Sequence, residues 1–230
     1  MDFGTAIGKP FSNITNLVIG IVLMIIPIVN ILTIPGYLLR VAKKTMDGDK
    51  KLPGFGNFGE LVISSIKMIV VGIVYGIIGM IVAFILMLIP FVGAVLVIIW
   101  YIVLTFIIYA AMMTLAQTND IGAALGIPTV TKKALKGSFI IAVIVAAIVT
   151  GIIASIVALV VILITGASLL PLLMSMSDPS LIMDPAMAME LFTGIMGMFM
   201  ILMPIMIILS FILNVFFITI VAEAYKKTAA

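Results

Sequence analysis

Long runs of apolar residues dominate the chain, and prolines or short polar connections separate them. A bilayer core of about 30 Å needs roughly 20 apolar residues per helix. Segments of that length run over Leu61 to Ile89, Phe91 to Leu115, Phe139 to Ile164 and about Gly194 to Val221. The pattern therefore predicts helices that span a membrane.

Two of the runs repeat each other. Ile21-Val-Leu-Met-Ile-Ile-Pro-Ile-Val29 recurs as Phe84-Ile-Leu-Met-Leu-Ile-Pro-Phe-Val92, and a second apolar run follows each copy. Proline removes a backbone donor and bends or ends a helix. The repeat predicts helical hairpins with Pro27 and Pro90 at their tips.

The N-terminal stretch from Asn16 to Leu39 has two readings. It is either one helix interrupted by prolines or a short hairpin with arms from about Pro10 to Ile26 and Ile28 to Thr45. Positive residues prefer the cytoplasmic side. The hairpin places all twelve Lys and Arg on that side, whereas a single helix places Lys9 outside. We therefore favour six membrane segments, with five as the open alternative.

The predicted fold is all-α, an integral membrane helical bundle that forms a single membrane domain over 1–230. It consists of three pseudo-repeated hairpins, of which the first is short and the third is the weakest copy, at 10–46, 59–118 and 134–228. Both termini are expected in the cytoplasm and the protein in the cell (plasma) membrane.

The third hairpin carries an insert at 166–193, which we expect to lie outward in the membrane interface. Gly166 and three prolines break it, it has three acidic residues, and it lacks Lys and Arg. Ten of the eighteen Met lie between Met174 and Met206. Thioethers are Cu(I) ligands, but Met also fills apolar gaps, so we expect no metal site.

The cytoplasmic connections contain helix-capping signals. Asn57-Phe-Gly-Glu60 resembles a capping box, Asn119-Asp120 predicts a short helix through Leu125, and Pro128 opens another that ends near Gly137. These pieces are expected at the membrane interface.

Composition limits the function. The chain is 65% hydrophobic and 9% charged, with no His and no Cys. The usual near-neutral general base and the commonest metal ligand are therefore missing, and we expect neither an enzyme nor a cofactor. The pI near 9.2 reflects sparse charge beside apolar spans, which favours lipid headgroups over nucleic acid as the partner.

Three sets of residues are candidates for function. Small residues for close helix packing, within the chain or with another subunit, are Gly72, Gly76, Gly79, Ala147, Gly151 and Ser155. Polar residues at membrane depth, which either bond between helices or line a path, are Thr105, Ser210 and Asn214. Basic residues that set the topology or dock headgroups or a partner are Arg40, Lys43, Lys44, Lys132, Lys133 and Lys136.

Over most of residues 10–165, the chain resembles the domain-of-unknown-function family numbered 4013 of archaeal and bacterial membrane proteins. The resemblance rests on Gly36-Tyr-Leu-Leu-Arg40, Leu52-Pro53, Gly59-Glu-Leu61 and Asn119-Asp-Ile-Gly-Ala-Ala124. It implies a small multi-helix membrane protein and supplies no catalytic residues.

The function predicted from the sequence is that of a non-enzymatic scaffold or accessory subunit in the membrane, with lipids and a second copy or a membrane protein as partners. The alternative is a transporter or channel for a small or lipid-like solute. A water-filled cavity around the polar set favours transport, and an exposed glycine stripe favours assembly.

Overall fold

The computed structural model describes residues 2–167, 174 and 185–229, and all regular elements in these residues are helices. The chain divides into two compact units. Unit 1 comprises residues 1–147 and 212–230, and unit 2 comprises 148–211. The predicted all-α class is confirmed for the described residues.

The helices of unit 1 begin with α1 (Phe3–Gly8), the 3-10 helix η1 (Lys9–Ser12), α2 (Ile14–Ile25) and α3 (Pro27–Met46). The long helices α4 (Phe58–Met87) and α5 (Gly93–Thr118) follow, and then the short helices α6 (Ile121–Ala124) and α7 (Ile127–Ala134). Helices α8 (Gly137–Ala167) and α11 (Pro185–Ala229) each belong partly to unit 1 and partly to unit 2.

Among the described residues, four helices are long and apolar enough to cross a membrane: α4, α5, α8 and the Met189–Thr228 part of α11. A fifth span exists only if α1–η1 and α2, which are bent by 79° at their junction, count as one. The first hairpin is too short to add two spans, since α2 has only 12 residues. Six membrane segments are therefore not confirmed.

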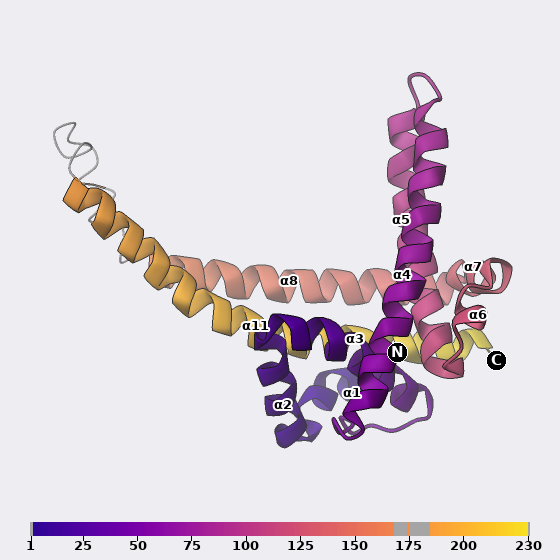
Figure 1. Cartoon of the computed structure of the whole chain (residues 1–230), viewed down its shortest axis with the longest axis horizontal. Coiled ribbons are helices and arrows are strands. Elements are labelled where there is room, and N and C mark those ends of the chain that lie inside the picture. Colours follow the sequence, from indigo (N-terminus) through magenta and orange to yellow (C-terminus); the bar gives the residue numbers. More distant parts are fainter. Residues whose placement is uncertain (1, 168–173, 175–184, 230) are drawn as a thin grey trace. The chain divides into compact units, whose positions relative to one another are not determined.

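Both predicted hairpin tips are helix breaks. Helix α2 ends at Ile25, Ile26 is extended, and Pro27 is the first residue of α3. Pro90 lies in the turn between α4 and α5, which run side by side away from that turn (Figure 1). Phe91 in the same turn has a φ of 65° and its side chain is fully exposed.

Two of the three capping predictions are confirmed. The Asp120 carboxylate accepts the Gly122 and Ala123 N–H groups at the start of α6, and a proline occupies the first turn of α7. The prediction of a capping box at Asn57 is wrong. Asn57 adopts a left-handed φ of 58° and its side chain makes no cap bond. Glu60, which should have completed the box, pairs instead with Arg40 of α3.

The boundaries of the 166–193 insert also need correction. Helix α8 continues through Gly166, so no break occurs there. Helix α11 begins at Pro185 and runs without interruption into the predicted span, so 185–193 is helical. Residues 168–173 and 175–184 of the insert lie outside the described residues.

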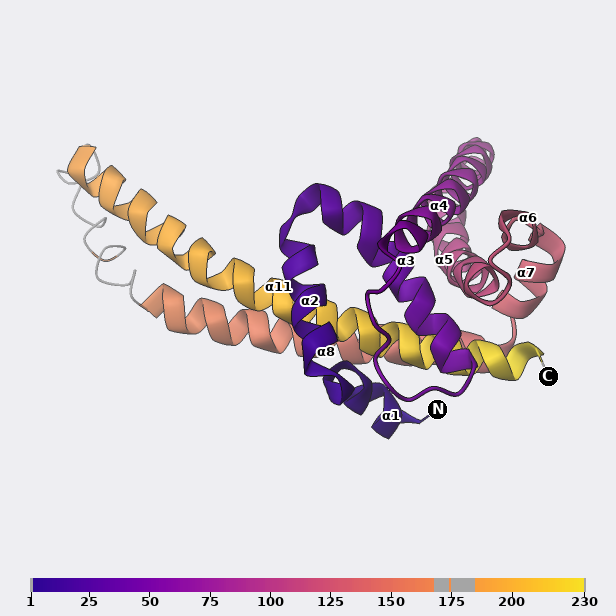
Figure 2. The same ribbon diagram turned by 60° about the horizontal axis from the view of Figure 1, so that its bottom comes forward.

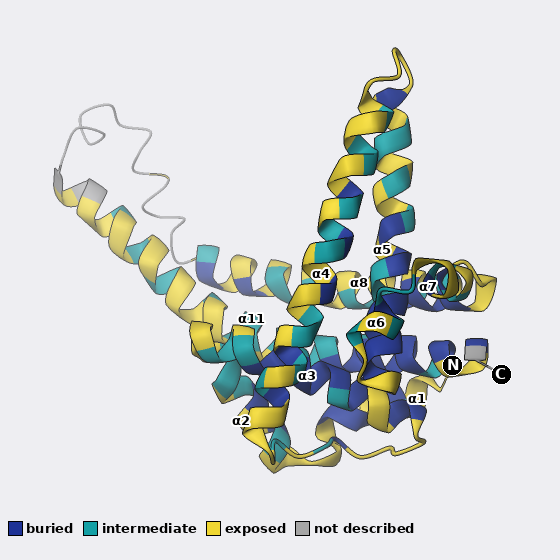
Figure 3. Ribbon diagram, turned by 45° about the vertical axis from the view of Figure 1, so that its right-hand side comes forward, coloured by how far each residue is buried: buried dark blue, intermediate teal, exposed yellow. Residues whose placement is uncertain are grey.

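The buried residues of unit 1 gather at one end of the α4–α5 hairpin. Along α5, Ile98 and Ile102 are exposed, whereas the positions from Ala110 to Ala116 are buried. Figure 3 shows exposed and half-buried residues along most of the distal halves of α4 and α5, and buried ones where their other ends meet α3. The distal half of the hairpin therefore presents apolar side chains outward.

Helices α3 and α4 touch backbone to backbone at Gly36. A Cβ atom at this position would lie 2.0 Å from the Leu61 carbonyl oxygen. The Gly36 N–H also donates a hydrogen bond of 2.7 Å to the Ser65 Oγ, and both residues are buried. Only glycine allows this approach, which sets the position of α3 against the base of the hairpin.

Candidate functional site

The polar contacts of unit 1 concentrate at the end where residues 2–12, 40–60, 118–137 and 223–228 come together, which we call the charged end. All twelve Lys and Arg belong to unit 1. Lys67 lies more than two turns into α4, yet its side chain reaches back to the charged end. There its Nζ donates to the Asn119 carbonyl and Oδ1 at 2.9 and 3.0 Å. The opposite end of the hairpin, at residues 88–92, carries no charge.

Lys9 joins the N-terminal helices to the end of α3. Its side chain is 1% exposed, and its Nζ donates to the Thr45 Oγ1 and the Asp49 carbonyl at 2.7 Å each. Burial lowers the pKa of Lys9 to about 8, and the nearby carboxylates of Asp49 and Glu223 oppose that shift. Because the buried Lys9 ammonium group cannot bond to bulk water instead, its bonds to Thr45 and Asp49 hold η1 against the turn after α3.

The connection 47–57 between α3 and α4 is tied to α3 along its length. Arg40 donates to the Gly54 and Gly56 carbonyls at 2.9 and 2.6 Å and to Glu60 at 3.1 Å. Tyr37 donates to the Pro53 carbonyl at 2.8 Å, and its ring stacks on Phe55 with centroids 3.9 Å apart. Figure 2 shows this extended connection passing α1 on its way to α4. Although it lacks secondary structure, it is held like an element of the fold.

A second set of contacts joins α5, α7 and α11. Lys133 donates to the Tyr225 hydroxyl at 2.7 Å, which also bonds to the Thr114 Oγ1 at 2.8 Å. Lys136 donates to the Thr228 carbonyl at 2.5 Å. Tyr225 is fully buried, so the end of α11 is anchored in the core of unit 1.

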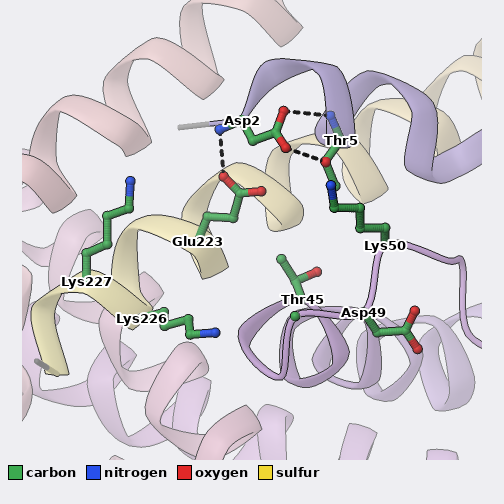
Figure 4. Close-up of a pocket in the computed structure, with 9 residues that line it drawn as sticks. Asp2, Thr5, Thr45, Asp49, Lys50, Glu223, Lys226 and Lys227 are labelled. Atoms are coloured by element: carbon green, nitrogen blue, oxygen red, sulfur yellow. Dashed lines mark hydrogen bonds between the residues drawn. The ribbon is translucent and has the colours of Figure 1, made fainter.

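A cavity of about 610 Å³ opens at the charged end, between α1, the turn after α3 and the end of α11. Charged side chains dominate its lining (Figure 4), which consists of Asp2, Thr5, Thr45, Gly48, Asp49, Lys50, Glu223, Lys226 and Lys227. The three acidic side chains of this lining accept hydrogen bonds within the chain, and the three basic side chains make none within the described residues.

Each acidic side chain of the cavity already accepts a backbone N–H. Asp2 accepts from the Thr5 N–H at 3.0 Å and from its hydroxyl, and these bonds lower the pKa of Asp2. Glu223 accepts from the Asp2 N–H at 2.8 Å, and Asp49 accepts from the Lys51 N–H at 2.9 Å. The bond to Glu223 joins α1 to α11, whereas the bonds to Asp2 and Asp49 are local and fix the backbone around them.

The basic side chains of the cavity are not engaged in this way. Within the described residues, Lys50, Lys226 and Lys227 make no hydrogen bond or ion pair, and all three are exposed. Lys50 lies near enough to Asp2 to favour its ionised form. The cavity thus offers three ammonium groups to an incoming anion.

A second, smaller cavity of about 70 Å³ lies beside the α3–α4 contact. Its polar lining consists of Arg40, Lys43, Glu60, Ser64 and Asn119. Its size admits little more than water, so it is a weaker candidate for a ligand site.

The structure divides the basic residues that were predicted to dock headgroups or a partner. Arg40, Lys133 and Lys136 are bound to groups of the chain itself. The remaining members of that set are exposed and lie outside the large cavity: Lys43, Lys44 and Lys132. The sequence did not single out Lys226 or Lys227 as members of a site, because their position depends on how α11 meets α1.

The six predicted packing residues also differ among themselves. Gly79 is buried against α5, where a Cβ would lie 2.4 Å from the Leu104 Cδ2, and its carbonyl accepts a bond of 3.1 Å from the Trp100 Nε1. A Cβ at Gly72, Gly76 or Gly151 would meet no atom within 4 Å. Ala147 and Ser155 are exposed.

The three residues of the predicted polar path line neither cavity. The Thr105 hydroxyl donates to the Tyr101 carbonyl one turn earlier at 2.8 Å, within α5. Ser210 and Asn214 both interact within the chain.

Comparison with known proteins places the chain in a family. No curated protein and no solved structure gives a significant match. One protein family matches residues 19–166, more than half of the chain. That region contains α3 to α7 and the Gly36–Ser65 contact, and it excludes α1 and α11, which supply Asp2, Glu223 and Lys226 to the cavity. The chain, with its long apolar helices, is a membrane protein that belongs to the family described as "Protein of unknown function (DUF4013)".

Proposed function

We propose that this protein is a non-enzymatic, multi-pass protein of the cell membrane that acts as a scaffold or accessory subunit, with both termini in the cytoplasm. The observation that carries the proposal is the contrast within unit 1. Polar contacts bind the charged end together, while the distal halves of α4 and α5 expose apolar side chains on most of their surface. Such a chain anchors itself at one face of a membrane and offers helices within it.

The charge distribution supports the proposed orientation. All Lys and Arg lie at one end of the α4–α5 hairpin and none at its tip. Because positive residues are retained on the cytoplasmic side, the charged end faces the cytoplasm and the turn at Pro90 faces outward.

Two glycines of α4, the exposed Gly72 and the half-buried Gly76, support a role in assembly. Helices associate in lipid through close packing at small residues, since lipid tails are as apolar as the side chains they would replace. Gly72 and Gly76 lie on α4 with open space before them. In this proposal, a transmembrane helix of another subunit packs there.

The surroundings of the predicted polar path favour assembly over transport. Thr105 satisfies its hydroxyl inside its own helix. No Asp, Glu, Lys or Arg lies in the sequence between Lys67 and Asp120, which covers the apolar lengths of α4 and α5. Ion and proton pathways usually depend on such groups at membrane depth.

The test compares two variants of α4 in the full-length protein. Gly72→Leu with Gly76→Leu should reduce the mass of the complex extracted from native membranes, with little change in the melting temperature of the isolated chain. The matched control changes exposed neighbours on the same helix, Ile73→Leu with Ile77→Leu, and should leave the complex intact. Equal masses for both variants and the wild type would remove the support for a scaffold, and solute uptake by vesicles of the purified protein would favour a transporter.

A further inference from the structure

Helix α1 has two different faces beside the large cavity. Asp2 and Thr5 line the cavity, and Ala6 is buried in unit 1. On the remaining face, Phe3 and Ile7 are 39% and 59% exposed, and Phe11 of η1 continues the stripe at 51%. Spacing of three to four residues places such side chains on one side of a helix.

An exposed apolar stripe next to charged groups is typical of a segment that lies in the membrane interface. Within the described residues, nothing covers the exposed parts of Phe3, Ile7 and Phe11. Contact of these apolar surfaces with water is unfavourable. If α1 lay at the boundary of headgroups and acyl chains, the stripe of Phe3, Ile7 and Phe11 would face the acyl chains, and the charged cavity beside it would be at headgroup level.

The basic side chains of the cavity are the groups left available to a ligand. Each of the cavity's carboxylates accepts a backbone N–H, whereas the ammonium groups of Lys50, Lys226 and Lys227 make no hydrogen bond or ion pair within the described residues. In Figure 4, Lys226 extends from α11 toward the side of the cavity formed by Thr45 and Asp49. Three free ammonium groups around an open cavity suit an anion with several acceptor oxygens, such as a phosphate. The volume of about 610 Å³ lies within the usual range of small-molecule sites, about 300–1,000 Å³.

We propose that this cavity binds the phosphate-bearing headgroup of an anionic glycerophospholipid of the cytoplasmic leaflet. Lys50, Lys226 and Lys227 donate to its phosphate oxygens, and the stripe on α1 and η1 lies against its acyl chains. The proposal rests on the cytoplasmic placement of the charged end proposed above and is independent of the scaffold role.

The probe is dioctanoyl phosphatidylglycerol, titrated into the delipidated full-length protein in neutral detergent and followed by native mass spectrometry. One variant carries Lys50→Gln, Lys226→Gln and Lys227→Gln. Its matched control carries Lys43→Gln, Lys44→Gln and Lys132→Gln, which remove the same charge from exposed positions of the charged end outside the cavity. All six lysines are exposed, so both proteins should melt like the wild type.

A lysine near an anionic headgroup contributes about a fivefold gain in binding. We therefore expect the cavity variant to lose about 100-fold in affinity and the control to lose less than threefold. Equal losses in the two variants would overturn the site, because net charge alone would then explain binding. The same conclusion would follow if the wild type bound dioctanoyl phosphatidylcholine as tightly as the anionic lipid.

A further comparison separates a lipid from a free phosphate ester. The variant Ile7→Ser with Phe11→Ser should lose at least tenfold in affinity for the lipid, because it removes the surface for the acyl chains. Glycerol 3-phosphate, which has the phosphate without acyl chains, should bind at least tenfold more weakly than the lipid. Binding of glycerol 3-phosphate at the affinity of the lipid would overturn the assignment to a lipid. The titration needs no partner protein, so its result does not depend on whether the scaffold proposal holds.

Discussion

Replacement of Gly36 by alanine tests the contact that positions α3 against α4. The added Cβ would lie 2.0 Å from the Leu61 carbonyl oxygen, 2.9 Å from the Leu61 carbonyl carbon and 2.9 Å from the Ser65 Oγ. The first two atoms belong to the backbone of α4 and cannot rotate away. The two helices must therefore move apart by more than 1 Å, which stretches the 2.7 Å bond from the Gly36 N–H to Ser65 beyond hydrogen-bond length.

The magnitude follows from three effects. Overpacking a close contact costs about 1–3 kcal/mol, and rigid backbone atoms place this case at the upper end. Loss of a buried hydrogen bond adds about 1 kcal/mol. Alanine is favoured over glycine within a helix by up to about 1 kcal/mol, which offsets part of the loss. The net expectation is a decrease of about 3 kcal/mol in the free energy of unfolding.

The measurement is thermal unfolding of the purified protein in detergent, followed by the fluorescence of Trp100. For a chain of this length, about 1 kcal/mol corresponds to roughly 2–4 °C, so Gly36→Ala should lower the melting temperature by about 6–12 °C. Gly72→Ala is the matched control. It is also in the interior of a long helix but has no atom within 4 Å of the new Cβ, so its melting temperature should stay the same or rise slightly. If the two variants melt alike, the backbone contact between α3 and α4 is refuted.

A cysteine that replaces Gly48 should be protected from membrane-impermeant maleimide in intact cells, whereas a cysteine that replaces Ser180 should react. The reason is that the positive residues hold the charged end in the cytoplasm. The reverse labelling pattern would refute the topology. Tyr225→Phe should lower the free energy of unfolding by about 1–3 kcal/mol, because it removes a hydroxyl that bonds two buried or half-buried partners, and the exposed Tyr101→Phe should be neutral in the same melt. Lys9 predicts a pH dependence: its folded pKa of about 8 lies below the usual 10.5, so the unfolded state binds the proton more tightly and stability rises with pH between these values. Relative to Lys9→Met, the wild type should gain about 2 kcal/mol from pH 7 to about pH 10, and parallel curves for the two proteins would contradict the lowered pKa.

The sequence predicted local structure well where one residue decides the backbone. Pro27 and Pro90 mark the ends of helices because proline lacks the N–H that a continuing helix requires, and Asp120 caps α6 with its carboxylate. The family match confirms the resemblance that was based on the Gly36 and Asn119 motifs. Such predictions need only neighbouring residues.

Predictions that depended on distant partners were less successful. Glu60 has the spacing of a capping box, but Arg40 from another helix competes for its carboxylate and the box does not form. The sequence identifies Gly36 only as part of a family motif. Its role in close helix packing depends on the Leu61 carbonyl of α4, which only the fold brings into contact with it. The glycine stripe of α4 has the correct spacing for packing, yet only Gly79 of its three glycines meets α5 closely, because periodicity does not identify which face a neighbouring helix covers.

The large cavity could not be predicted for the same reason. Two of its three acidic residues, Asp2 and Glu223, come from opposite ends of the chain and are joined by one hydrogen bond. From the sequence, Lys226 and Lys227 indicate only which end of the helix faces the cytoplasm. Their position in the cavity depends on how α11 packs near α1, which the sequence does not reveal.

The concentration of polar contacts at the charged end has a physical cause. In a bilayer, moving an apolar side chain from lipid into a protein core releases little free energy, so helices depend on close packing and polar bonds to hold together. In the distal hairpin, the bond from Trp100 to the Gly79 carbonyl links α4 and α5. At the charged end, Lys9, Arg40 and Lys133 each bridge separate elements. Polar bonds between separate elements of unit 1 are therefore concentrated at the charged end. A helix that docks against Gly72 and Gly76 would disturb none of these bonds, which is the arrangement expected of a subunit that keeps its own fold while it supports another.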